Sequence, residues 1–321
     1  MTITWTPVLV SRLKELRLAG TPYAECAEIL GNELGKPISY DQISMAARRY
    51  RLTNLLEKDA LAITYQPTTL PMDDYAICSD VHAPFHSELW VNRFLMMADL
   101  FRVKKAIMVG DLLDCQFASK WYSEDSVGLD KEIDSVRSLF NVLGSAFEKI
   151  YWCRGNHENR IGMMTDGAVQ LRHLGRSFTG ELWDKKISYS RYDKFFVGDD
   201  WMLVHPKSYR QSVISVAREL AAKYLRNIIN THGHFVGSGY DKSGRFQCYD
   251  LGGLFDVSKV DYAQLNTTTH PAWGNGFGIL RAGKLWHFTE NDDWDYWAKG
   301  FDEGRALHLT FAPVRNREKG D

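Results

Sequence analysis

Beyond residue 74 the sequence alternates short apolar runs with longer amphipathic segments, and this alternation limits the folds that the chain can adopt. Amphipathic segments at 89–101 and 131–147 have the periodicity of helices. Strands that alternate with helices are typical of layered α/β proteins, whose ligands bind where loops leave the carboxyl ends of strands. The predicted strands are 75–78, 105–109, 149–153, 195–196, 201–204, 227–231, 276–281 and 284–289.

Five of these runs are followed by side chains that can bind a metal ion. The motifs are DVH at 80–82, GDLLD at 110–114, GNHE at 155–158, a single histidine at 205 and HGH at 232–234. Because the loops leave corresponding ends of successive strands, we expect these side chains to meet at one site. The candidate ligands are Asp80, His82, Asp111, Asn156, His205, His232 and His234.

The residue types indicate which metals would bind. Carboxylate, imidazole and amide groups suit divalent ions such as manganese, iron or zinc, whereas copper(I) and iron–sulfur clusters prefer thiolates. Two neighbouring ions need a ligand that bridges them, and the carboxylate of Asp111 is the natural bridge. The glycines that precede Asp111 and Asn156 allow the backbone to turn sharply after a strand.

The ordered motifs DxH, GDxxD, GNHE, a single later histidine and a final HxH resemble the calcineurin-like metallophosphoesterase family over roughly residues 74–290. The resemblance implies a layered β-sandwich flanked by helices and the hydrolysis of phosphate esters with two divalent ions, manganese first among them. It also implies that His157 assists the leaving oxygen. The implied ligands are Asp80, His82, Asp111 and His234 for one ion, and Asp111, Asn156, His205 and His232 for the other.

Several residues near these motifs depart from the family pattern or have more than one possible role. Thr231 stands where the family usually has glycine before the final HxH, which affects the expected loop shape. Asp114 either orients a ligand histidine or caps a helix. Arg154 and Arg160 flank the GNHE motif, where they either grip a phosphate or form salt bridges on a surface turn.

Residues 1–60 are predicted to form a small domain of three short helices, followed by a linker at 61–73. The third helix begins with a capping-box pattern at Ser39–Gln42 and ends in a basic cluster. The domain resembles the helix-turn-helix domains of phage and bacterial regulators, with the third helix as the recognition helix. The candidate DNA contacts are Arg48, Arg49 and Arg51; alternatively, the bundle docks on the enzyme or on another protein.

Composition excludes some classes of function. The net charge of −1 and the pI near 6.8 give no general field that would attract nucleic acid, so any such binding requires a local patch. The five cysteines are scattered without a CxxC motif, which is not typical of a disulfide framework. With no export signal or membrane-spanning stretch expected, the predicted protein is cytoplasmic and has no membrane partner.

A DNA-binding module joined to a phosphoesterase domain resembles phage-type DNA repair exonucleases, so we predict a nuclease that cleaves DNA. Residues 291–321 are expected to be a C-terminal extension. One alternative is a phosphatase or phosphodiesterase for a small molecule or a phosphoprotein. Another is a DNA-binding regulator whose phosphoesterase fold is inactive. The sequence indicates no particular protein partner.

Overall fold

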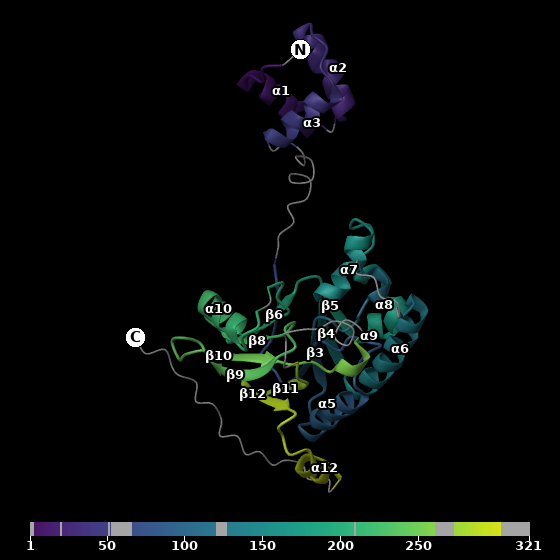
Figure 1. The fold of residues 1–321 in the computed structure, drawn as a ribbon, viewed down its shortest axis with the longest axis vertical. Coiled ribbons are helices and arrows are strands. Elements are labelled where there is room, and N and C mark those ends of the chain that lie inside the picture. Colours follow the sequence, from purple (N-terminus) through teal and green to yellow (C-terminus); the bar gives the residue numbers. More distant parts are fainter. Residues whose placement is uncertain are drawn as a thin grey trace. The chain divides into compact units, whose positions relative to one another are not determined.

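A computed structural model describes residues 3–19, 21–50, 52, 66–119, 127–208, 210–260 and 273–302 (Figure 1). The chain divides into two compact units, Met1–Gln66 and Pro67–Asp321. Among the described residues, no helix has both the length and the apolar character needed to cross a bilayer.

The N-terminal unit contains the three predicted helices. Its core is built from apolar side chains of all of them, with Leu13, Leu30 and Ile43 completely buried. The predicted capping box is present, because the Ser39 amide donates to Gln42 Oε1 at 2.9 Å and the Gln42 amide donates to Ser39 Oγ at 3.3 Å. The helices are α1 (Pro7–Leu18), α2 (Tyr23–Leu34) and α3 (Tyr40–Arg49).

The second unit contains two six-stranded sheets. One has the order β1 (Thr68–Leu70), β6 (Lys194–Val197), β7 (Trp201–Val204), β8 (Asn227–Asn230), β10 (Gln247–Leu251) and β9 (Val236–Tyr240). The other has the order β12 (Lys284–Thr289), β11 (Gly276–Arg281), β2 (Tyr75–Cys78), β3 (Lys105–Val109), β4 (Lys149–Cys153) and β5 (Ile187–Ser190). Both sheets thus contain strands from distant parts of the sequence.

The two sheets pack face to face and helices cover their outer faces. One buried cluster joins side chains of both sheets, including Tyr75 and Ile107 from one and Leu203 and Ile229 from the other. The outer face of the β2–β3–β4 sheet is covered by α5 (Glu88–Leu100), α6 (Leu129–Ala146) and α8 (Leu171–Thr179), and that of the other sheet by α10 (Ser215–Tyr224). This is the layered sandwich that the sequence predicts.

Strand direction determines where the polar loops lie. β2, β3, β4 and β5 run parallel to one another, with Val109 opposite Cys153 and Cys153 opposite Ser190. In the other sheet β7 and β8 are parallel, with Val204 opposite Asn230. Because parallel strands end at the same edge of a sheet, the loops that follow them are neighbours.

All eight predicted strands are present, each with boundaries within one residue of the prediction. Four further strands, β1, β5, β9 and β10, escaped prediction because they are short or mix polar and apolar residues. β1 lies inside the stretch 61–73 that we expected to be a linker, and it pairs in parallel with β6. The remaining helices of the described residues are α7 (Asn156–Met164), α9 (Leu182–Lys185) and α12 (Trp294–Asp302), with 3₁₀ turns at Gln116–Ala118 and Val257–Lys259.

Part of the region after residue 290 packs against the second unit, although we expected an extension there. Helix α12 lies within the predicted C-terminal extension, and its Trp294 and Trp297 pack against the core of the second unit. Residues 303–321 lie outside the described part of the chain. Arg51, one of the predicted DNA contacts, also lies outside it.

Candidate metal centre

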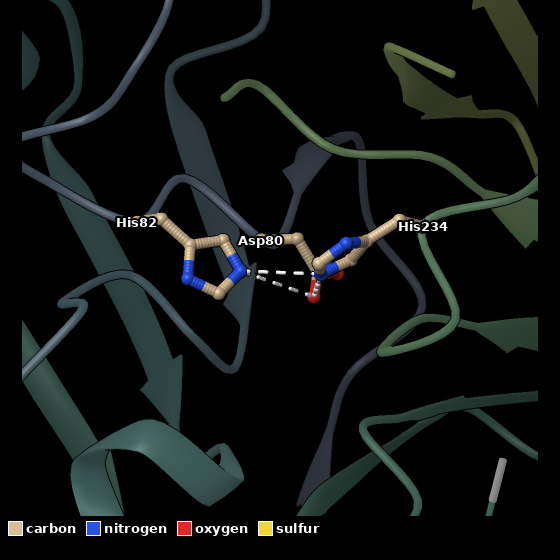
Figure 2. Close-up of side chains that lie close together, drawn as sticks. All are labelled: Asp80, His82 and His234. Carbon is tan, nitrogen blue, oxygen red and sulfur yellow. Dashed lines mark hydrogen bonds and ion pairs between the residues drawn. The ribbon is translucent and has the colours of Figure 1, made fainter. Parts of the chain in front are cut away.

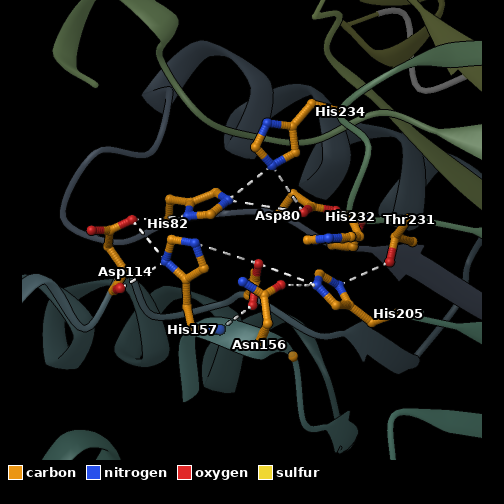
Figure 3. Close-up of polar contacts among 12 residues, drawn as sticks. Asp80, His82, Asp114, Asn156, His157, His205, Thr231, His232 and His234 are labelled. Carbon is orange, nitrogen blue, oxygen red and sulfur yellow. Dashed lines mark hydrogen bonds and ion pairs between the residues drawn. The ribbon is translucent and has the colours of Figure 1, made fainter. Parts of the chain in front are cut away.

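The structure brings all seven candidate ligands to one site, at the ends of β2, β3, β4, β7 and β8 (Figure 3). Six of them are aspartates and histidines that form close groups whose ligand atoms lie within 4.8 Å of one another. The seventh, Asn156, reaches His205 Nε2 with its Oδ1 at 2.9 Å. The side chains that follow these strand ends therefore lie together in one site.

Asp80, His82 and His234 form the first group (Figure 2). Nε2 of His234 lies 3.2 Å from Nε2 of His82 and 3.1 Å from Oδ1 of Asp80. All three side chains are buried, and Asp80 Oδ1 accepts no hydrogen bond among the described residues. A buried carboxylate oxygen without a donor is costly, and a divalent cation between these atoms would satisfy it.

Asp111, His205 and His232 form a second group on the other side of the site. Asp111 Oδ2 lies 3.2 Å from His205 Nε2 and accepts no hydrogen bond among the described residues. Its Oδ1 accepts from the His157 amide at 2.8 Å. Asp111 also belongs to a further group with His82 and His157, so its carboxylate faces both halves of the site. This position fits a carboxylate that bridges two ions.

Hydrogen bonds from outside the site fix the orientation of two ligand histidines. Nδ1 of His82 lies 3.0 Å from Oδ1 of Asp114, and Nδ1 of His205 lies 3.1 Å from the carbonyl oxygen of Val109. A carboxylate and a carbonyl only accept, so each ring donates from Nδ1. Nε2 of each ring consequently points into the site, as in metal-binding histidines whose other nitrogen is hydrogen-bonded.

The carboxylates make the site strongly attractive to positive charge. Burial lowers the pKa of His82, but its interactions with Asp114 and Asp80 outweigh burial and raise that pKa to about 10. Burial likewise opposes the charge of His205, while the neighbouring Asp111 raises its pKa to about 9. Metal ligands must be deprotonated, so a bound cation would replace protons on these rings. The residues present therefore fit divalent metal ions.

Strained backbone conformations concentrate at the same residues. Five of the candidate ligands adopt positive φ angles, at 47° for Asp80, 49° for His82, 48° for Asp111, 74° for His232 and 57° for His234. Such conformations cost about 1–3 kcal/mol each in non-glycine residues and cluster at functional sites. The fold thus holds these loops in shapes that local preference does not favour.

Asp114 contacts two histidines and caps none of the described helices. Besides His82, its Oδ1 lies 3.1 Å from Nδ1 of His157, and the following 3₁₀ turn begins only at Gln116. Arg160 donates from Nη1 to the Asp114 carbonyl and from Nη2 to His157 Nε2, both at 2.9 Å. Asp114 thus lies against the ring nitrogens of two histidines, and Arg160 contacts Asp114 and His157 at the site rather than lying on a surface turn.

His157 lies at the edge of the cluster. Its Nδ1 donates to the Asp114 carbonyl at 2.8 Å, because that carbonyl oxygen only accepts, and its Nε2 accepts from Arg160. Nε2 lies 3.8 Å from Asp111 Oδ2. The ring is therefore within reach of a group bound between the metals, while Asp114 and Arg160 hold it in place.

Glu158 is the most important residue that sequence reasoning missed. Its buried carboxylate accepts from the amides of Leu112 at 2.7 Å, Leu113 at 3.1 Å, Asp111 at 3.0 Å and Gly155 at 2.7 Å. One side chain thus joins the Asp111 loop to the start of α7. The available signal was its place in GNHE, one residue after His157.

Two small-residue positions show how closely these loops approach. A Cβ on Gly155 would lie 2.1 Å from Asp111 Oδ1, so only glycine fits there. Position 231, in contrast, accommodates a side chain: the Thr231 hydroxyl lies 3.1 Å from the Val109 carbonyl oxygen and 3.0 Å from His205 Nδ1. The departure from the usual glycine therefore adds a polar contact to a candidate ligand.

The fold and the site together define a class of protein, an α/β sandwich whose strand ends hold carboxylates and imidazoles suited to divalent metals. The family model for calcineurin-like phosphoesterases matches residues 75–296, which is more than half of the chain. The protein therefore belongs to the calcineurin-like phosphoesterase family, whose members are metal-dependent phosphoester hydrolases.

Comparison with solved structures gives distant similarities. The phosphoesterase YfcE from E. coli is 12% identical, with 64% of this chain and 87% of that chain covered and a TM-score of 0.33. The nuclease MPE from Pseudomonas putida is 13% identical, with coverages of 67% and 87% and a TM-score of 0.28. A dimetal phosphatase from Danio rerio is 11% identical, with coverages of 68% and 96% and a TM-score of 0.35. A search of curated proteins gave no significant match.

Proposed function

We propose that the protein is a dinuclear metal-dependent phosphodiesterase that cleaves nucleic acid, with DNA as its substrate. The observation that carries the dinuclear part is the position of Asp111, whose carboxylate belongs to groups on both sides of the site and has a buried oxygen without a donor. None of these groups includes a cysteine, and oxygen and imidazole donors favour manganese, with iron or zinc as alternatives.

The chain's own residues divide into two sets of ligands that share Asp111. When bound, two divalent ions lower the pKa of water and neutralise charge on phosphoryl oxygens. Asp114 and the Val109 carbonyl keep the Nε2 atoms of His82 and His205 aimed into the site. One set is Asp80, His82, Asp111 and His234, and the other is Asp111, Asn156, His205 and His232.

His157 is proposed to assist the leaving oxygen. In the present geometry its Nε2 accepts from Arg160 and its proton is on Nδ1. To donate from Nε2 the ring must become doubly protonated, so Arg160 has to turn away from Nε2. The guanidinium then lies beside the site, where it can contact a phosphoryl oxygen. Arg160 is thus the stronger phosphate-binding candidate at the metal centre itself.

The N-terminal unit supports a polymer as substrate. Arg48 and Arg49 are exposed at the end of α3, on a helix whose opposite face, with Ile43 and Ala47, is buried in the unit's core. Exposed arginines at a helix surface can neutralise DNA phosphates. A module that binds DNA raises the local substrate concentration at a catalytic domain joined to it.

The metal-site proposal is tested with two variants of the full chain. Asp111→Asn should lower bound manganese and abolish hydrolysis of bis-p-nitrophenyl phosphate, because it removes the shared anionic ligand. His157→Ala should keep the metals, measured by elemental analysis, and lose most of the rate. Full metal loading in the Asp111 variant would contradict the bridging role, and wild-type turnover of the His157 variant would contradict its assistance to the leaving oxygen.

Substrate class is tested by comparing single-stranded DNA, duplex DNA, RNA, bis-p-nitrophenyl phosphate and p-nitrophenyl phosphate with manganese present. The proposal predicts that diesters are cleaved faster than the monoester and that DNA is cut. Rapid monoester hydrolysis without cleavage of any nucleic acid would favour a phosphatase for a small molecule or phosphoprotein. DNA binding without any hydrolysis would favour a regulator with an inactive phosphoesterase fold.

The DNA-binding role is tested by replacing Arg48 and Arg49 together with alanine. Each lost phosphate contact should make the log–log salt dependence of DNA binding shallower by about 0.9, so the double variant should lose about 1.8. Lys14→Ala, which removes an exposed charge from α1, serves as the matched control. An unchanged salt dependence in the double variant would favour a bundle that docks on protein.

A further inference from the structure

A cavity of about 460 Å³ that is lined by several polar side chains lies beside the metal centre, on the other side of α7. Its walls come from α7, from the segment that leads into α8, from the loop after β4, and from the end of β5 with the loop after it. The size is within the range of about 300–1,000 Å³ that is usual for small-molecule pockets. The polar residues that matter most in its lining are Arg154, Asn159, Asp166, Tyr189 and Arg191.

Two guanidinium groups give the cavity its chemistry. Arg154 is half-buried, and its guanidinium has no ion pair or hydrogen bond with any residue in the described part of the chain. Arg191 lines the same cavity from the loop after β5. A partly buried cation is costly without a partner, and arginine is the side chain best suited to hold a phosphate with two parallel hydrogen bonds.

Within the described part of the chain, the acidic residues of the lining form no ion pair with Arg154. The Glu158 carboxylate is already engaged by four backbone amides and is 1% exposed. Asp166 is the other acid of the lining, and it is exposed. The half-buried Arg154 therefore faces a cavity in which an exposed carboxylate is the remaining negative group.

The cavity also offers an aromatic surface. Tyr189 lines it and is held by two tryptophans, with ring centroids 5.7 Å from both Trp152 and Trp183. Asn159 adds an amide group that can donate and accept. Arginines beside a fixed aromatic ring form the combination with which proteins bind the phosphate and base of a single strand.

The position of the cavity relates it to the catalytic site. β3, β4 and β5 are adjacent parallel strands, and Asp111, Arg154 and Arg191 follow their ends. Adjacent strands lie about 4.8 Å apart, so Arg191 is displaced from the Asp111 loop by about 10 Å. Asn156 and Asn159 lie on the same helix, one turn apart. The nucleotide next to a phosphodiester bound at the metals can span this separation, whereas a simple monoester cannot.

We infer that this cavity is a subsite for the nucleotide adjacent to the scissile phosphodiester, in which Arg154 and Arg191 bind its phosphate and Tyr189 contacts its base. The inference rests on the proposed cleavage of nucleic acid and assigns it a substrate-binding region outside the metal centre. It assigns Arg154 a place in this subsite rather than at the metals.

The test measures binding of the dinucleotide pTpT to the full-length protein stripped of metal, which separates the subsite from catalysis. Arg154→Ala and Arg191→Ala should each weaken binding about tenfold, the loss expected for a charge-assisted hydrogen-bonded contact. Arg172→Ala, an exposed arginine of α8 outside the lining, is the matched control. Unchanged pTpT affinity in both cavity variants would overturn the inference.

A gain-of-affinity variant guards against misfolding as an explanation. Asp166 has a φ of 48°, a conformation that asparagine tolerates, so Asp166→Asn should preserve the turn. Removing its charge should tighten pTpT binding about twofold to fivefold, as expected for an exposed charge pair. Binding that weakens or stays the same in this variant would contradict a phosphate in the cavity.

Kinetics separate the subsite from the proposed function. In Arg191→Ala, the kcat/KM for a DNA oligonucleotide divided by that for bis-p-nitrophenyl phosphate should fall about tenfold, and in Arg172→Ala it should not. If the wild type cuts no nucleic acid while pTpT binding depends on both arginines, the nuclease proposal fails, and the cavity remains a nucleotide-binding site without the inferred place beside a scissile phosphodiester. If DNA is cut and this ratio is unchanged in Arg191→Ala, the subsite fails and the nuclease stands.

Discussion

Replacing Glu158 with glutamine tests whether one buried carboxylate holds the metal loops together. Glutamine has the same shape, but one of its two terminal atoms is an NH₂ group that only donates. Each carboxylate oxygen of Glu158 accepts from two backbone amides, Leu112 and Leu113 at Oε1 and Asp111 and Gly155 at Oε2. Whichever way the amide is oriented, two buried N–H groups lose their acceptor.

The expected loss in the free energy of unfolding follows from the number of N–H groups that lose their acceptor. A buried donor left without a partner costs about 1–3 kcal/mol, so two cost about 2–6 kcal/mol. An opposing effect comes from charge, because burial and the nearby Asp111 raise the pKa of Glu158 and disfavour its ionised form. Neutral glutamine recovers part of that penalty. We therefore expect a loss of about 2–4 kcal/mol in the free energy of unfolding.

Urea unfolding followed by tryptophan fluorescence measures this loss, because every tryptophan except Trp5 lies beyond residue 66 and so reports on the second unit. Glu148→Gln, at an exposed position, should change stability by no more than about 0.5 kcal/mol and is the matched control. Hydrolysis of bis-p-nitrophenyl phosphate should fall in Glu158→Gln because the Asp111 loop is no longer held. Wild-type stability together with wild-type turnover would refute this reasoning.

Two further predictions concern residues near the site. Asp114→Ala removes the acceptor that orients His82, so manganese affinity measured by titration should fall about 10- to 100-fold, and an unchanged affinity would count against this orienting role. Burial raises the pKa of Glu132 from 4.5 to about 8. Between these pH values the folded state retains a proton that the unfolded state releases. The free energy of unfolding should therefore fall as pH rises through this window. Glu132→Gln should remove that fall, making the variant more stable at pH 8 by at most about 5 kcal/mol, whereas parallel pH profiles of unfolding would contradict the assignment.

Much of the fold was predictable because its central strands are short, apolar and followed by polar loops. β3 and β4 have the predicted boundaries, Lys105–Val109 and Lys149–Cys153. A strand buried on both faces needs a continuous apolar run, and such a run is visible in a single sequence. β1 and β9 were missed because edge strands require no such run, and their pairing depends on neighbours distant in the chain.

The residue types that gather at the site can be read from the sequence, since a strand end followed by Asp80 or Asp111 is a local pattern. The contacts that support these side chains arise only when distant segments pack together. Glu158 binds amides more than forty residues away, and Asp114 joins His82 to His157.

The two arginines beside GNHE show the same division. The sequence placed both near a phosphate-binding motif, but helix direction turns Arg160 toward His157 and strand order places Arg154 with Arg191 in a separate cavity. A local pattern specifies the backbone element and the type of side chain. The partner of each side chain depends on which elements pack together, and that is determined by burial and hydrogen bonding across the whole fold.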